Sequence, residues 1–128
     1  MIASGQTVKI YSASGHKLSG GCNTRIFAVY GRLALSSLTL ADGFVSTSAC
    51  SAPYSLCSGG LAFVSSFGFL SLESCVLLNS AAYRGGALYL SSSGNFTTNY
   101  TTFRGNNATH VRGEWGPRAV LVRCSLLG

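Results

Sequence analysis

The chain has 128 residues, which is enough for one domain with its own core and too few for two domains of ordinary size. Charged residues make up only 9% of it, whereas soluble globular chains usually have about 25%, so a bundle of amphipathic helices with charged outer faces is excluded. The net charge is +6, but the nine Lys and Arg residues are scattered, so we predict no nucleic-acid partner and expect these residues to be solvated.

The residue types favour β-structure. The helix-forming residues Glu, Gln, Lys and Met are nearly absent, whereas Ser, Thr, Gly and Asn supply the polar positions. We therefore predict an all-β chain.

The N-terminal part indicates an irregular first segment. Residues 1–10 lack the basic region and the long apolar run of a signal peptide. Val8, Ile10 and Leu18, followed by residues 25–29, place apolar side chains at strand-like spacing. We expect these residues to form one incomplete leading coil.

A repeat follows, and it is the strongest signal in the sequence. Residues 59–77 align with residues 85–103 without a gap at an offset of 26, and residues 31–43 align with residues 68–80 at an offset of 37. The aligned apolar residues include Leu33 with Leu70, Leu35 with Leu72, Leu40 with Leu77, Leu70 with Phe96, and Leu77 with Phe103. The 11 additional residues of the larger offset predict that residues 44–58 form an inserted loop.

The apolar spacing within each copy predicts two short strands that meet at a two-residue corner, such as Ser36–Ser37 or Glu73–Ser74. With the strand after the Gly pair, each repeat becomes three short strands around a triangle. Stacked coils would then form three parallel sheets with strands ~4.8 Å apart. We predict a right-handed parallel β-helix, a single-stranded solenoid of about four to five coils.

Residues 61–78 are apolar enough to suggest a membrane span, but they contain four Ser residues, a Gly and a Glu. Because the repeat accounts for this stretch, we predict no transmembrane segment.

The repeat resembles that of the polymorphic outer-membrane protein type of β-helix and of the wider pectin-lyase-like superfamily, in which a Gly pair and an apolar strand precede T-L-T-L-x-N-C-T-F-x-x-N-x-A. The matching residues are Gly59, Gly60, Leu70, Leu72, Cys75, Leu77 and Asn79, and then Gly85, Gly86, Phe96, Thr98, Phe103, Asn106 and Ala108. The Cys of the family pattern is present only at Cys75. The resemblance implies an architecture and no particular chemistry, since the superfamily contains lyases, glycosidases, adhesins and phage spikes.

The residues that could support catalysis are few and dispersed. Asp42 and Glu73 occupy different repeat positions, and Glu114 lies in an irregular stretch, so no carboxylate pair is assembled. His16 and His110 have no Cys or acid at metal-ligand spacing. We predict no catalytic residue, no metal site and no cofactor.

The five Cys residues allow one small disulfide loop. Cys50 and Cys57 bracket six residues within the predicted insertion, and a disulfide between them would form if the protein is secreted. Cys75 occupies an inward position and is expected to be a buried core residue. Cys22 and Cys124 remain without an assigned partner.

Three N-glycosylation sequons begin at Asn95, Asn99 and Asn107. Asn and Thr are also natural corner and strand residues of a β-helix, so a purely structural role is the alternative. Trp115 is a candidate for stacking on a sugar ring, with a core or cap position as the alternative.

These observations lead to one expectation about function. We expect residues 1–128 to be a segment of a longer solenoid, in contact with neighbouring coils. It would act as a non-catalytic extracellular or cell-surface scaffold with a role in adhesion or in contact with a glycan or another surface ligand. The alternative is a fragment of a polysaccharide-active lyase or glycosidase whose catalytic acids lie outside this chain.

Overall fold

The computed structural model describes residues 1–45, 57–91 and 93–108. These residues form short strands and no helix. The strands are β1 (Thr7–Tyr11), β2 (Lys17–Ser19), β3 (Phe27–Val29), β4 (Arg32–Ser36), β5 (Thr39–Ala41), β6 (Ala62–Val64), β7 (Phe69–Glu73), β8 (Val76–Leu78), β9 (Ala81–Ala82), β10 (Leu88–Leu90), β11 (Asn95–Asn99), β12 (Thr102–Arg104) and β13 (Asn107–Ala108).

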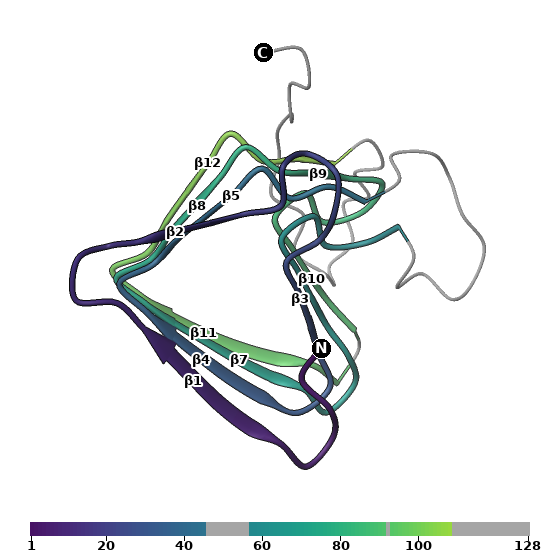
Figure 1. The fold of residues 1–128 in the computed structure, drawn as a ribbon. Coiled ribbons are helices and arrows are strands. Elements are labelled where there is room, and N and C mark those ends of the chain that lie inside the picture. Colours follow the sequence, from purple (N-terminus) through teal and green to yellow (C-terminus); the bar gives the residue numbers. More distant parts are fainter. Residues whose placement is uncertain (46–56, 92, 109–128) are drawn as a thin grey trace.

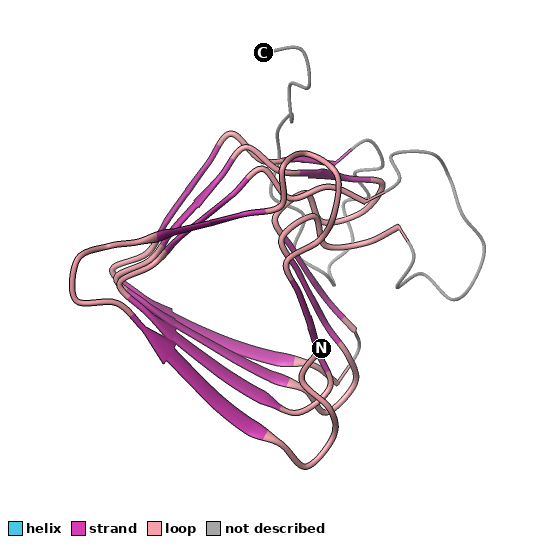
Figure 2. Ribbon diagram, in the orientation of Figure 1, coloured by secondary structure: helices cyan, strands magenta, loops and turns pink. Residues whose placement is uncertain are grey.

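The strands pair in parallel and form four sheets. The strand orders are β1-β4-β7-β11, β10-β6-β3, β12-β8-β5-β2 and β13-β9. Figure 1 shows the three larger sheets as the sides of a triangle, with β9 near one corner. Figure 2 shows that loops and turns separate the strands at the corners. The predicted all-β fold with parallel sheets is confirmed.

The register between strands follows the offsets found in the sequence. Leu70 of β7 is paired with Leu33 of β4 on one side and with Phe96 of β11 on the other. On the next side of the triangle, Leu77 is paired with Leu40 and with Phe103. The predicted alignment of these residues is therefore confirmed.

Two of the repeats contain one strand more than predicted. β9 and β13 pair through Ala81 with Asn107 and Ala82 with Ala108. They lie between the second corner and the Gly pair, in a segment where two residues are too few to show an alternation of apolar and polar side chains. The sequence pattern therefore could not indicate this strand.

The chain turns at the predicted two-residue corners, but the first residue of each corner still belongs to the preceding strand. Their second residues, Ser37, Ser74 and Tyr100, all have left-handed φ angles of 55°, 53° and 50°. At the next corner, the equivalent residues Asp42, Asn79 and Gly105 are also left-handed. Asp, Asn and Gly tolerate this conformation better than other residues, which explains why they occupy the second corner.

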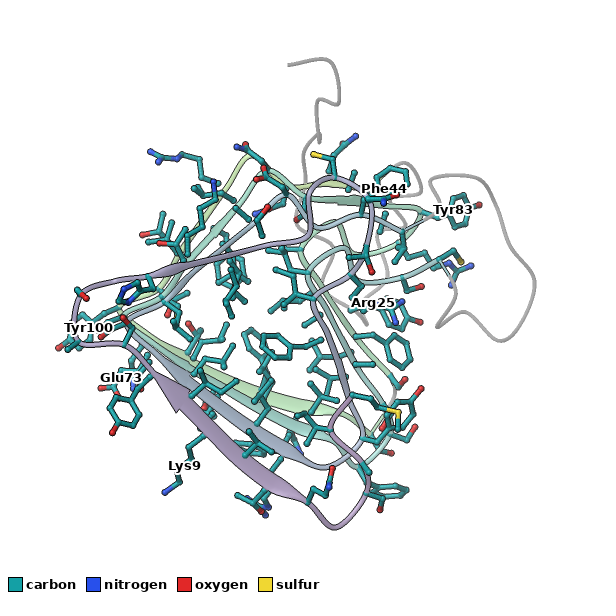
Figure 3. All side chains as sticks on the ribbon, in the orientation of Figure 1. Lys9, Arg25, Phe44, Glu73, Tyr83 and Tyr100 are labelled. Carbon is teal, nitrogen blue, oxygen red and sulfur yellow. The ribbon has the colours of Figure 1, made fainter. Side chains whose placement is uncertain are left out.

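The core fills the interior of the triangle, as the side chains in Figure 3 show. Leu70, Leu72 and Leu77, which were predicted to point inward, are fully buried. Phe96 and Phe103 pack against the same core but are only partly buried. They lie on β11 and β12, each of which is the last strand of its sheet in the described part of the chain, so one flank of each ring meets no further described strand.

The Gly pair allows two adjacent segments of chain to approach closely. A Cβ atom on Gly60 would overlap the carbonyl oxygen of Gly86, and one on Gly86 would lie 2.5 Å from the backbone of Asn107. The amide of Gly60 donates to Gly86 O at 3.0 Å. Only glycine fits at this crossing, which accounts for the Gly pair that recurs in the sequence.

The two ends of the predicted inserted loop, residues 44–58, pair with the next turn of the chain. Phe44 forms a bridge with Ala81, and Ser58 forms a bridge with Arg84. The carbonyl of Cys57 accepts a hydrogen bond from the amide of Tyr83 at 3.0 Å. Residues 46–56 lie outside the described residues, so the loop itself stays a prediction.

The most apolar stretch of the chain, residues 61–78, contributes strands β6, β7 and β8. Within the described residues there is no helix with the length and apolar character needed to cross a membrane.

Candidate functional site

The outward side chains of the sheet β1-β4-β7-β11 form an exterior surface that we call the outer face. Inward and outward side chains alternate along each strand, so the outward set begins with the first residue of each strand and takes every second one. Its members are Thr7, Lys9, Tyr11, Arg32, Ala34, Ser36, Phe69, Ser71, Glu73, Asn95, Thr97 and Asn99. Most are polar or small, and Lys9 is visible outside β1 in Figure 3. The surface thus differs from one strand to the next although the core beneath it is repetitive.

The two described carboxylates occupy different corners of the triangle. Glu73 ends β7 and is paired with Ser36 and Asn99. Asp42 follows β5, and its Oδ2 lies 3.6 Å from Lys17 Nζ and accepts a hydrogen bond from Ser19 Oγ at 3.1 Å. The expectation that these acids stand on separate ladders agrees with this register. Glu114 lies outside the described residues.

His16 takes part in a local turn that is held by side-chain hydrogen bonds. Ser12 Oγ lies 2.6 Å from His16 Nδ1 and accepts hydrogen bonds from the amides of Ser14 and His16. Because the hydroxyl accepts these two bonds, its own proton is free to be donated to Nδ1. The contact therefore closes a turn between β1 and β2. In the described part of the chain, no three His, Cys, Asp or Glu side chains gather where they could hold a metal ion.

The described cysteines fall into two groups. Cys22 and Cys57 each take part in a disulfide bond. Cys75 is a free, buried thiol whose Sγ donates to Leu35 O at 3.5 Å and to Glu73 O at 3.4 Å, so its predicted core position is confirmed. Cys50 and Cys124 lie outside the described residues, and the predicted pairing of Cys50 with Cys57 lies there with them.

The structure places the three sequons differently. Asn95 and Asn99 lie at the two ends of β11 and are exposed. Asn107 is half-buried in β13, and its amide donates to Ser80 O at 2.7 Å. Trp115, the candidate for stacking on a sugar, lies outside the described residues.

An aromatic cluster on the outside of β6 was not found by sequence reasoning. Phe63 points away from the core, yet only 6% of it is exposed. Tyr89 stacks on it with ring centroids 5.7 Å apart, and Tyr30 lies 6.4 Å away in a tilted arrangement. Arg25 Cζ lies 5.4 Å from the centre of the Phe63 ring. Such contacts between a cation and an aromatic ring are favourable when they are sheltered from water.

Arg25 is not the solvated residue that the scattered basic charges predicted. Its Nε donates to Gly59 O at 3.1 Å and its Nη2 to Ser58 O at 2.8 Å. Burial lowers the pKa of the Arg25 guanidinium, and the nearby Tyr30 opposes this shift. An arginine side chain does not lose its proton in proteins, so the group stays charged at neutral pH. Because Arg25 lies just before β3, its two hydrogen bonds connect the start of β3 to the Gly-pair corner.

Comparison of the chain with protein-family models, with curated proteins and with solved structures finds no match.

Proposed function

We propose that this chain is a segment of right-handed parallel β-helix that serves as a non-catalytic extracellular or cell-surface scaffold for adhesion or glycan contact. The observation that carries this proposal is the register. The same parallel pairing recurs from β4 to β7 and from β7 to β11, so a repetitive core supports an outer face whose residues change at every step. A rigid body with a variable exterior is suited to binding along its side.

The order in which the chain visits the sheets supports the β-helix. β6, β7 and β8 contribute to three different sheets in turn, and β10, β11 and β12 return to the same three sheets in the same order. Ser80 and Asn106, one repeat of 26 residues apart, are joined by a buried hydrogen bond of 2.7 Å. Together with the Gly pairs, this pattern resembles the pectin-lyase-like superfamily.

The cysteines and the composition support a location outside the cell. Disulfides persist in oxidising compartments, and both Cys22 and Cys57 are disulfide-bonded. The outer face relies on Ser, Thr and Asn more than on charged residues. The extracellular assignment predicts that reducing agents will destabilise the protein.

The glycan-contact part of the proposal rests on exposed aromatic side chains. Tyr11, at the end of β1, is 79% exposed, and Phe67, before β7, is 85% exposed. Aromatic rings present a flat apolar surface that can stack on the face of a sugar ring. A ligand that lies along the outer face could contact either ring.

The test is binding of the purified chain to an array of glycans and immobilised polysaccharides. We expect binding without turnover, a loss of about 5-fold or more on Tyr11→Ala or Phe67→Ala, and binding close to that of the unaltered chain for the matched control Tyr11→Phe. Binding to no glycan would reject the glycan-contact role. Release of unsaturated products or reducing ends, abolished by Asp42→Asn or Glu73→Gln, would instead establish a polysaccharide-active enzyme.

A further inference from the structure

We propose that Asn95 and Asn99 are modified with N-linked oligosaccharides, and that Asn107, the third sequon, is not. The inference rests on the extracellular location proposed above and adds passage through a eukaryotic secretory route. It also assigns a role to exposed residues that the fold alone does not require.

Asn95 and Asn99 are well placed to carry large groups. Both are exposed, and because side chains alternate along a strand, residues four apart on β11 point the same way. Their Cα atoms are about 13 Å apart at the usual rise per residue, which leaves room for two sugar chains. Within the described residues, neither Asn side chain makes a hydrogen bond, so modification breaks no contact there.

The ladders show that the fold does not require Asn at these two positions. Asn95 is equivalent to Phe69 and Arg32, and Asn99 is equivalent to Glu73 and Ser36. The side chains at each position differ in size and in charge, and all of them point outward. The structural alternative for these two sequons is therefore weak.

Two other Asn residues, in contrast, have roles that the fold requires. Asn79 adopts a left-handed corner with φ of 49°. Asn106 is fully buried: its Oδ1 accepts from the amide and the hydroxyl of Ser80, and its Nδ2 donates to Leu77 O. Neither Asn begins a sequon.

Tyr100 adds an independent observation. It follows Asn99 at the corner, is 89% exposed, and appears in Figure 3 projecting from the same corner as Glu73. An aromatic ring left in water beside an attachment site would be covered by the apolar face of the first sugar. Thr101 is the third residue of the sequon that begins at Asn99. Its hydroxyl donates a hydrogen bond to Asn99 O at 2.9 Å and stabilises the corner.

Asn107 is unsuited to the same modification. It is half-buried in β13 between the fully buried Asn106 and Ala108. Its backbone lies against Gly86, where even a Cβ atom would come within 2.5 Å. The Asn107 side chain is therefore less accessible than those of Asn95 and Asn99.

The experiment uses the full chain, secreted from cultured eukaryotic cells behind an added leader. Three variants retain one sequon each: Asn99→Gln with Asn107→Gln, Asn95→Gln with Asn107→Gln, and Asn95→Gln with Asn99→Gln. Intact mass of the secreted protein is measured before and after treatment with peptide-N-glycosidase. In the variant that retains Asn95, Thr97→Val removes the sequon while preserving the β-branched side chain, and Thr97→Ser preserves the sequon.

We expect the variants retaining Asn95 and Asn99 each to lose one oligosaccharide on treatment, and the variant retaining Asn107 to be secreted without one. Thr97→Val should abolish the mass change and Thr97→Ser should not. Secreted protein that is glycosylated at Asn107, or unmodified at Asn95 or Asn99, would overturn the proposal. If a variant is not secreted, peptide mapping of the unaltered chain decides by the Asn-to-Asp conversion that the glycosidase leaves. Because the leader is supplied, the result does not depend on where the protein is located in its own cell, and localisation there tests the proposed function separately.

Discussion

Leu70 lies at the centre of a column of inward side chains, between Leu33 of β4 and Phe96 of β11. It is fully buried, whereas its neighbour Ser71 points to the outer face. This contrast between adjacent residues is what a strand with one face on a core produces.

Replacing Leu70 with Ala should lower the free energy of unfolding by about 2–5 kcal/mol, because it removes buried apolar volume and leaves a cavity between two packed neighbours. Urea unfolding followed by circular dichroism measures this. The matched control Ser71→Ala should change stability by less than about 0.5 kcal/mol. Similar effects of the two substitutions would show that this register of inward and outward residues is wrong.

The role of a single residue was predictable from the sequence only where it followed from the repeat. The inward Leu residues were predictable because an apolar residue at a fixed repeat position must face the shared core. Arg25 was not predictable, because its partners Ser58 and Gly59 are more than 30 residues away and come together only when the chain closes the Gly-pair corner. The left-handed Tyr100 could be predicted only as a corner, not as an exposed ring.

At the scale of elements, the Gly pair is a point where two segments of chain approach closely. Gly60 and Gly86 are equivalent residues one repeat apart, and both lie against backbone atoms. The side chains of the strands on either side are spaced by the ordinary distance between sheets and strands. A side chain at Gly60 or Gly86 would therefore require the backbone to move.

Gly60→Ala should destabilise the protein by about 1–3 kcal/mol or more, since a methyl group cannot enter without moving two backbones. Gly15→Ala is the comparison. A Cβ atom at Gly15 would have no atom within 4 Å, so the only cost is that of a left-handed φ of 73° for a residue with a side chain. That substitution should cost about 1–2 kcal/mol. Denaturant midpoints of the two variants give the difference, and a Gly60→Ala protein as stable as the original would contradict the close crossing.

The ends of the predicted insertion belong to the stack, as the pairing of Phe44 with Ala81 and of Ser58 with Arg84 shows. The sequence offset predicts an insertion but could not fix its ends, because paired backbones at the edge of a loop leave no apolar pattern.

A chain in which residues 46–56 are replaced by a short Gly-Ser linker should retain its β-structure and unfold cooperatively, because both paired ends remain. Circular dichroism and thermal unfolding are the measurements. Loss of the cooperative transition would mean that the removed segment is an integral coil of the fold.

At the scale of the whole molecule, the sheets surround one core and turn three sides outward (Figure 1). This arrangement separates the two described carboxylates, since Glu73 lies before β8 and Asp42 lies after the paired strand β5. Asp42 contacts Lys17 and Ser19, and Glu73 is paired with Ser36 and Asn99, so the two acids have different surroundings. The proposed function is binding along the side of the molecule, and the assay for released products tests it against a reaction that requires two acids together.

The central claim is that equivalent residues 26 apart lie side by side in parallel, and engineered disulfides test it most directly. Ser71 and Thr97 are paired on the outer face, so the double variant Ser71→Cys with Thr97→Cys places its sulfur atoms within bridging range. The pair Glu73→Cys with Thr97→Cys is displaced by two residues, at about 7–8 Å, which is too far for a bridge. After mild oxidation and peptide mapping by mass spectrometry, we expect a disulfide in the first variant and none in the second. A bridge in the second variant with none in the first would contradict the parallel stacking.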